Sequence, residues 1–336
     1  MPKKYDTIDL LKFIGSILVF TMHLNLFLGT TANLAVQLAA RWCVPFFFIT
    51  SSFFLFKKAD NGVIPAQKLK SYVKRILLLY LAWMIINIPS IVYMRIITNG
   101  VSSPLTYFNL IKNTLLSSSF TGSWYLAGSV FSAVVIYFLS KKLSSKAILI
   151  CTFPFYLICV TTSVYGGVLN DSLSFVLKDM LCFPTNIFGG LFYFALGKFL
   201  AENHKKLKSI SLLKICLLLG LAFAAYCAEV LLANKLNVLS STDFALSTAL
   251  TGFAFVLLGM NLNLKIKNSL VLRKASTIIY CAQGNVLLLN GATKKLLHIS
   301  NDILLYCIML FVMAVIVAII LLLQKKTNLR IFQYLS

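Results

Sequence analysis

Long apolar runs separated by short basic segments make up almost the whole chain. A helix that crosses a bilayer needs about 20 mostly apolar residues, and roughly ten such runs can be marked along the sequence. Their ranges are 9–30, 34–56, 76–97, 120–139, 147–165, 184–201, 212–233, 243–260, 276–292 and 302–323. The pattern predicts an all-α, polytopic membrane protein, with residues 1–336 forming a single integral membrane domain.

The segments between these runs alternate between rich and poor in Lys and Arg. The rich segments hold Lys57, Lys58, Lys68, Lys70, Lys74 and Arg75; Lys141, Lys142 and Lys146; Lys205, Lys206, Lys208 and Lys214; Lys265, Lys267, Arg273 and Lys274; and Lys325, Lys326 and Arg330. The positive-inside rule predicts that this set is cytoplasmic, which places both termini inside. Two longer outer segments, 98–119 and 166–183, have the length to pack over the outer mouth.

Composition narrows the class further. Hydrophobic residues make up 59% of the chain and charged residues 12%, which is too little charge to cover a soluble domain of this size. The net charge of +22 is spread over topology-setting loops, so we expect no nucleic-acid partner. The eight Cys form no CxxC pair and there are only three His, so neither a disulfide framework nor a metal site is expected.

Two basic residues inside the first two runs are the strongest candidates for chemistry. His23 and Arg41 both lie about 5–6 Å outward of the midpoints of their runs, and a short loop makes those runs antiparallel neighbours. A basic group at this depth costs about 2.5–3.5 kcal/mol, so such groups usually face a protein interior. His23 could act as a general base, while Arg41 could hold a carbonyl or phosphate oxygen or orient the imidazole. The alternative is that His23 bonds a neighbouring helix and Arg41 reaches outward to the interface.

Lys12 with Asp9, and Glu229, have two interpretations each, and Trp124 has one. Lys12 either marks the cytoplasmic interface or pairs with Asp9, three residues earlier. Glu229 is either a proton relay or partner of the basic pair, or a wetted residue near the outer end of its run. Trp124 opens the fourth run, where Trp is common in the interfacial belt.

A cationic segment enters the third run and contains Lys70, Lys74 and Arg75. Clustered cations at a cytoplasmic mouth can bind the phosphates of a nucleotide-like donor. The same cluster can equally attract anionic lipid headgroups.

Several motifs follow one another along the chain: Asp9-Leu-Leu-Lys12 with His23, Arg41-Trp-Cys-Val44-Pro45-Phe46-Phe47-Phe48-Ile-Thr-Ser51, Tyr72-Val-Lys74-Arg75-Ile-Leu-Leu-Leu-Tyr80, Trp124-Tyr125-Leu126, Phe192-Tyr-Phe194-Ala-Leu-Gly197 and Ile279-Tyr280. In kind and order they resemble the motifs of the acyltransferase family 3 membrane enzymes. The resemblance covers about residues 5–325. The chain departs from the family pattern where many members have His, Arg-Asn, a first Arg or Ser-Gly: these positions are Gln283, Thr185-Asn186, Tyr72 and Ser51-Ser52.

The resemblance implies acyl transfer from a cytoplasmic acyl-CoA, with acetyl-CoA expected, to a hydroxyl acceptor on the outer side. His23 would be catalytic with Arg41 and Lys12 in support, and Lys74 and Arg75 would help to hold the phosphates. Acyl-CoA is then a donor substrate and not a tightly bound cofactor. The acceptor would be an exopolysaccharide, a glycolipid or a cell-wall sugar. The implied location is the plasma membrane, among membrane lipids; the residue usage is compatible with a bacterium, and a homo-oligomer is compatible with the sequence.

A transporter or flippase for a glycan or small polar solute is the rival from another class, with His23, Arg41 and Glu229 lining its path. The absence of an internal repeat and of paired Gly/Pro-broken runs counts against this alternative.

The charge pattern makes a direct topological prediction. Cysteine labelling should place positions near Lys58, Lys142 and Lys206 in the cytoplasm and positions near Ser103 and Asn237 outside. The reason is that short loops rich in Lys and Arg are retained on the cytoplasmic side. Outside labelling of the loop at 68–75 would contradict the whole scheme.

Overall fold

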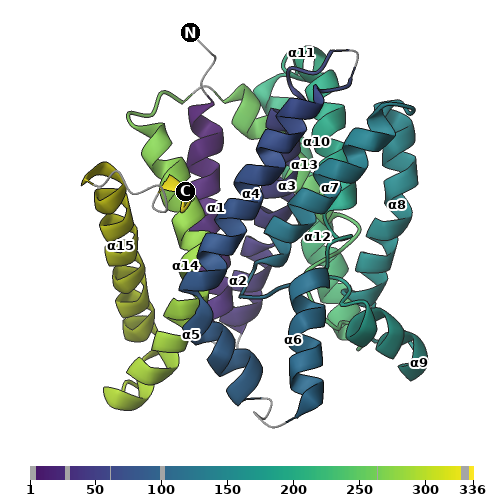
Figure 1. The fold of residues 1–336 in the computed structure, drawn as a ribbon. Helices are drawn as coiled ribbons and strands as arrows, with labels where there is room; N and C mark the ends of the chain where they lie inside the picture. Colours follow the sequence, from purple (N-terminus) through teal and green to yellow (C-terminus); the bar gives the residue numbers. More distant parts are fainter. Residues whose placement is uncertain (1–4, 27–30, 61, 99–102, 263, 327–332) are drawn as a thin grey trace. The chain divides into compact units, whose positions relative to one another are not determined.

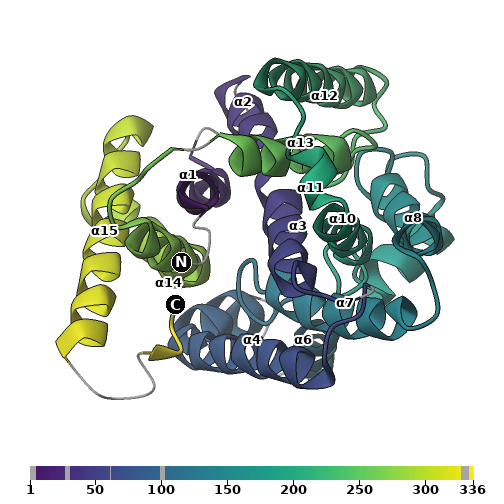
Figure 2. The ribbon, with the colours of Figure 1, turned by 90° about the horizontal axis from the view of Figure 1, so that it is seen from above.

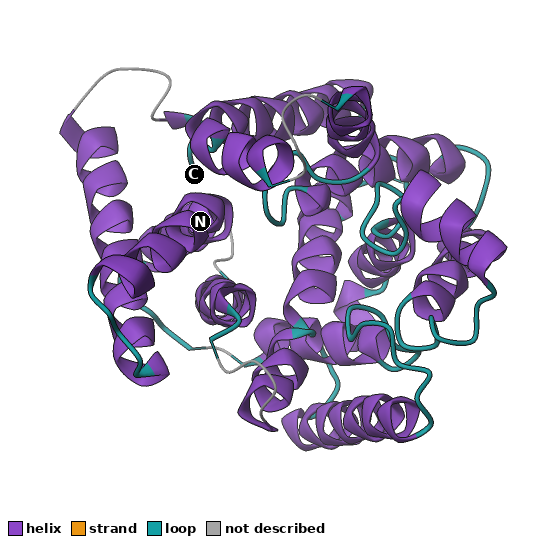
Figure 3. Cartoon of the chain, turned by 90° about the horizontal axis from the view of Figure 1, so that it is seen from below, coloured by secondary structure: helices purple, strands orange, loops and turns teal. Residues whose placement is uncertain are grey.

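Helix is the dominant structure throughout the described residues. The computed structural model describes residues 5–26, 31–60, 62–98, 103–262, 264–326 and 333–336. Figure 3 shows no strand in these ranges, and their only β feature is an isolated bridge between Asp60 and Val63. The predicted all-α class is therefore confirmed for the part of the chain that is described.

Every predicted apolar run overlaps at least one helix. In chain order these helices are α1 (Asp6–Leu24), α2 (Thr31–Ala40), α3 (Cys43–Phe56), α4 (Ala66–Ile86), α5 (Ile88–Ile91), η1 (Val92–Ile97), α7 (Trp124–Ser140), α8 (Ser145–Thr162), α10 (Leu191–Glu202), α12 (Leu212–Lys235), α13 (Thr248–Asn261), α14 (Ser269–Leu296) and α15 (Asp302–Lys326). Helices also occupy segments that the hydropathy pattern left as connections: α6 (Pro104–Leu116), α9 (Asp171–Ser174), η2 (Phe175–Met180) and α11 (His204–Leu207).

Fewer helices than predicted spans have the length and hydropathy to cross a membrane. Among the described residues there are five: α1, the stretch Thr31–Phe56 made of α2 and α3, α8, α12 and α15. A sixth arises if α4 and the following segment to Met94 form one span, although they are bent by 67°. The apolar helices α7 and α13 are shorter, and α14 carries polar residues in its interior. The count of about ten spans is therefore not confirmed by helix length.

The chain divides into two compact units. The first unit comprises Met1–Ile8, Arg41–Leu77 and Trp124–Lys265, and the second comprises Asp9–Ala40, Leu78–Ser123 and Ile266–Ser336. Consecutive residues of α1 and of α4 therefore belong to different units, and each unit is described by itself.

In the first unit α3 lies beside α10, α13 and α7 (Figures 1 and 2). Two glycines of the α10 region make the approach of α10 to α3 possible. A Cβ added at Gly190 would lie 2.3 Å from the ring of Phe48, and one added at Gly197 would lie 2.4 Å from the carbonyl oxygen of Ile49. The ring of Phe48 in turn contacts Trp124 and Tyr125 at centroid distances of 5.5 and 4.7 Å. This close packing holds α3 and α7 in a defined register.

In the second unit α14 packs against α15 and α5. The bend between α4 and α5 falls at Asn87, whose Nδ2 donates to the carbonyl oxygens of Trp83 at 2.9 Å and Cys281 at 3.0 Å. The Asn87 side chain thus links the bend to α14 through its bond to Cys281.

The α3–α10 contact gives a prediction about stability. Gly197→Ala should lower the free energy of unfolding by about 1–3 kcal/mol, because a methyl group there collides with backbone and not with a flexible side chain. Gly220→Ala is the matched control, since nothing lies within 4 Å of the added Cβ on α12. Thermal unfolding in detergent measures both variants. Equal melting temperatures for the two would contradict the packing described above.

Candidate functional site

His23 and its two supporting candidates lie in the part of α1 that belongs to the second unit. His23 is in the last turn of α1 and is half-buried. Asp9 forms an ion pair with Arg273 of α14, with Oδ1 3.9 Å from Nε. Ser276, also on α14, donates to the carbonyl oxygen of Lys12 at 2.9 Å. Asp9 therefore has a partner on another helix, and Lys12 is held through its backbone.

These two contacts set the register between α1 and α14. Asp9 faces Arg273 and Lys12 faces Ser276. A step of three residues along α1 thus corresponds to a step of three residues in the same direction along α14, so the two helices run parallel. Continuing this register at about 1.5 Å per residue brings His23 level with Leu287, about one turn beyond Gln283.

Gln283 is fully buried on α14. Its Nε2 donates to the carbonyl oxygen of Thr121 at 3.4 Å, and Tyr280, one turn earlier, donates to that of Gly122 at 2.8 Å. The Oε1 of Gln283 makes no hydrogen bond to any described residue, and the same holds for the buried oxygens Asn87 Oδ1 and Ser119 Oγ. The sequence did not indicate Asn87 or Ser119, since nothing in a local pattern distinguishes an unpaired buried amide or hydroxyl.

Arg41 lies in the first unit, just before α3. Its Nε donates to Thr242 Oγ1 at 2.8 Å, and its Nη1 forms an ion pair with Asp243. Tyr226 donates from its hydroxyl to the carbonyl oxygen of Thr242 at 3.3 Å, so the segment before α13 is held from two sides. Asp243 partly neutralises Arg41 and was not among the sequence candidates. His23 and Arg41 belong to different units, and their shared layer stays a prediction.

Glu229 is engaged in a dense set of hydrogen bonds inside the first unit. It accepts from the backbone N–H groups of Leu246 at 2.7 Å and Ser247 at 3.1 Å, and from Ser247 Oγ at 2.7 Å. The hydroxyl of Tyr165 donates to it at 3.1 Å. These bonds tie α12 to the segment before α13, and a proton-relay role stays a prediction.

Trp124, the first residue of α7, is buried within the first unit. Its ring contacts Phe48 and Phe244, at centroid distances of 5.5 and 6.1 Å. The described contacts thus place it in the packed interior, in contrast to the exposed position that an interfacial belt residue would have.

The cationic segment of α4 presents two different faces. Lys70, Lys74 and Arg75 are exposed. Lys68 and Tyr72 are one helical turn apart, and the Lys68 ammonium and the Tyr72 hydroxyl are both buried without a hydrogen bond to any described residue. Helical spacing puts Arg75 on the same face, and its Cζ lies 5.9 Å from the centroid of the Tyr72 ring. Lys70 and Lys74 point elsewhere around the helix. The positions of these residues around a helix follow from the sequence alone and could have predicted that the two sets lie on different faces.

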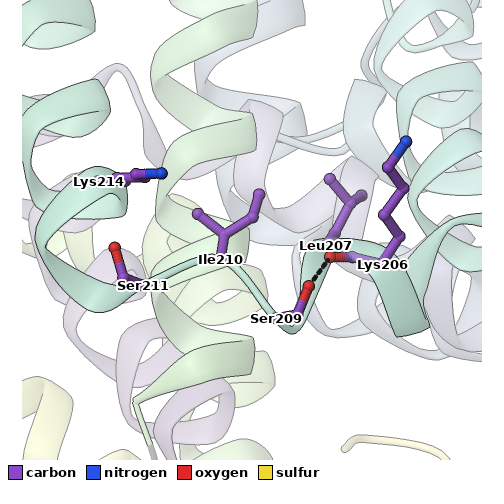
Figure 4. A pocket seen from close by; sticks show the side chains of 6 residues that line it. All are labelled: Lys206, Leu207, Ser209, Ile210, Ser211 and Lys214. Carbon is purple, nitrogen blue, oxygen red and sulfur yellow. Dashed lines mark hydrogen bonds between the residues drawn. The ribbon is translucent and has the colours of Figure 1, made fainter.

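A hollow of about 390 Å³ lies between α11 and the start of α12 (Figure 4). Its lining residues are Lys206, Leu207, Ser209, Ile210, Ser211 and Lys214. Both lysines are exposed and no carboxylate lines the hollow, which suits contact with anionic headgroups. Among the described residues no group of His, Cys, Asp or Glu is arranged to hold a metal ion.

The bonds of Glu229 give a prediction. Glu229→Ala should lower the free energy of unfolding by about 1–3 kcal/mol, because it leaves the N–H groups of Leu246 and Ser247 without partners. Asp171→Ala, at an exposed carboxylate, is the control and should change it by less than about 0.5 kcal/mol. Denaturation of purified protein in detergent gives both values. An unchanged free energy of unfolding for Glu229→Ala would contradict this structural role and would leave a chemical role for the carboxylate.

Comparison with known proteins gives one family and one relative. The acyltransferase family 3 model, described as an acyltransferase domain, matches residues 5–323. An amino-acid racemase of Enterococcus faecalis is 29% identical over 238 residues, which make up 65% of this chain and 32% of that protein. The matched stretch thus spans about a third of the length of this curated relative. No solved structure matches the chain.

Proposed function

Because the chain belongs to acyltransferase family 3 over residues 5–323, we propose that it is a membrane O-acyltransferase. It would move an acyl group, with acetyl expected, from cytoplasmic acyl-CoA to a hydroxyl of an exopolysaccharide, a glycolipid or a cell-wall sugar. The observation that carries this proposal is the family match, which includes every candidate residue from Asp9 to Gln283. The apolar helices support a membrane location.

The proposed topology has about ten spans, with both termini in the cytoplasm of a bacterial cell. Helices overlap all the predicted runs, and the alternation of basic loops supplies the orientation. In this arrangement α4 begins on the cytoplasmic side, where acyl-CoA is present. Its exposed cations Lys70, Lys74 and Arg75 would meet the donor phosphates.

The proposed chemistry is a direct acyl transfer. His23 removes the proton of the acceptor hydroxyl as that oxygen attacks the thioester carbonyl carbon. A C–O bond forms, the C–S bond breaks, and CoA leaves as a thiolate. The imidazolium then returns the proton to the thiolate or to solvent. Arg41, held on one edge by Asp243, would position the reacting carbonyl or the imidazole.

Substitution of His23 tests this function. His23→Gln should lower acetyl transfer by at least about 100-fold, because an amide can replace a hydrogen bond but cannot take the proton. The assay follows radiolabelled acetyl-CoA with purified protein and cell-envelope glycans as acceptor. His204→Gln is the matched control: among the described residues His204 bonds its local backbone through Nδ1, at 2.8 Å from the carbonyl oxygen of Ala201, and the variant should keep full activity. Acetyl transfer by His23→Gln at the wild-type rate would refute the assignment of His23 as the base.

A second candidate is transport of a small polar solute, which the amino-acid racemase relative favours over a glycan. In this case the chain would carry an amino acid across the membrane. Proteoliposomes loaded with buffer and given radiolabelled amino acids, without acetyl-CoA, distinguish the two. Saturable uptake together with no acetyl transfer would replace the acyltransferase proposal.

A further inference from the structure

We propose that buried hydroxyls of α3, α4 and α7, together with Lys68, bind the pantetheine arm and adjoining phosphate of the acyl-CoA donor. This inference rests on the proposed acyltransferase function and deepens it. The hydroxyl lane, as we name it, consists of Lys68, Tyr72, Ser51, Tyr125, Ser129 and Ser132, and all six residues belong to the first unit.

Tyr72 is the centre of the hydroxyl lane. Its side chain is nine-tenths buried, and the hydroxyls of Ser51, Tyr125 and Ser129 surround its phenol. The hydroxyls of Ser51 and Ser129 lie within reach of the phenol oxygen, but none of these contacts has the geometry of a formed hydrogen bond. The Tyr72 ring is fixed from the other side by the ring of Phe194, with centroids 6.3 Å apart. A fixed phenol with unmet hydrogen-bonding capacity is suited to a polar ligand.

The hydroxyls continue along one face of α7. Tyr125 lies 2.8 Å from Ser51 Oγ, and Ser129 and Ser132 follow at spacings of four and three residues. Ser129 and Ser132 are at most 1% exposed, and neither Oγ has a hydrogen-bond partner among the described residues. Serines in helices usually bond a carbonyl oxygen three or four residues earlier. Ser140 does so on the same helix, donating to Tyr137 at 2.7 Å.

Lys68 places a positive charge at one end of the hydroxyl lane. Its ammonium is buried without a hydrogen bond to any described residue, and its charged neighbour is a second cation, Lys58. The carboxylate of Glu202 forms an ion pair with Lys198. A buried ammonium beside another cation favours an anionic ligand, such as a phosphate.

The chemical groups along CoA match the side chains along the hydroxyl lane. The pantetheine arm of CoA carries two amides, a hydroxyl and a terminal thiol or thioester, and none of these groups is charged. Hydroxyl side chains can both donate and accept, so a series of them satisfies amide N–H and C=O groups alike. Beyond the arm come the phosphates, which require cations. The α4 and α7 segments run in opposite directions (Figure 1). The lane therefore leads from a cation into neutral polar groups.

Stability of the ligand-free protein is the first readout. Each unbonded hydroxyl costs free energy in the empty protein, so Ser129→Ala and Ser132→Ala should leave the melting temperature unchanged or raise it. Ser140→Ala, which removes a bonded hydroxyl from the same helix, is the control. Marked loss of stability in Ser129→Ala and Ser132→Ala would mean that water or backbone satisfies these groups, and it would overturn the inference.

Calorimetric binding of two probes is the decisive test. Tyr72→Phe and the Ser129→Ala/Ser132→Ala double variant should weaken CoA binding by about 10-fold, equivalent to about 1.4 kcal/mol. They should leave the binding of 3′-phospho-ADP, which lacks the arm, unchanged. Lys68→Gln should weaken both probes, and Ser140→Ala neither.

The outcomes separate this inference from the function on which it rests. If the hydroxyl variants weaken the binding of both probes equally, or weaken neither, the proposed role of the hydroxyl lane is overturned. Acetyl transfer by the wild-type protein would still support the acyltransferase function in that case. A wild-type protein that binds neither CoA nor 3′-phospho-ADP would overturn both. Weakened binding of a sugar acceptor, with CoA binding intact, would assign the hydroxyls to the acceptor and overturn the lane.

Discussion

Pairing of polar atoms inside apolar helices is the constraint on which this structure depends. A buried polar group without a partner costs about 1–3 kcal/mol, and hydrocarbon offers no water to satisfy it. The chain meets this constraint at Glu229, whose carboxylate accepts four hydrogen bonds, and at the amide nitrogen of Asn87, which donates two hydrogen bonds at the bend after α4. It does not meet it at Tyr72, Ser129 and other buried atoms. The bonded groups hold the fold together, whereas the unbonded ones are available to a ligand.

Close packing of aromatic rings and glycines gives the unbonded groups fixed positions. Gly190 and Gly197 let α10 approach α3, and the ring of Phe48 then packs against Trp124 and Tyr125 of α7. A loosely packed helix could turn its hydroxyls toward its own backbone, as Ser140 does. Rigid helices with unpaired groups are preorganised for binding, so less ordering is needed when a ligand arrives.

The sequence predicted the fold where the signal was local. Apolar runs indicated the helices well, but α6 and η2 fall in Ser- and Asn-containing segments whose hydropathy indicated loops. The sharp bend at Asn87 was hidden because its partner Cys281 is distant in sequence. The site was less predictable for the same reason: Arg41 pairs with Asp243, which no local pattern connects to it. Lys68 could have been found, because helical phase alone separates it from Lys70 and Lys74.

The central claim is that this membrane protein takes acyl-CoA at α4 and uses it as donor. A structure determined by electron cryo-microscopy, in lipid nanodiscs with a non-hydrolysable acetyl-CoA analogue, tests this claim most directly. We expect density for the phosphates beside Lys68 and Arg75, and for the pantetheine arm along Tyr72, Ser129 and Ser132. Density for the analogue at another face of the protein, or none at saturating concentration, would contradict it.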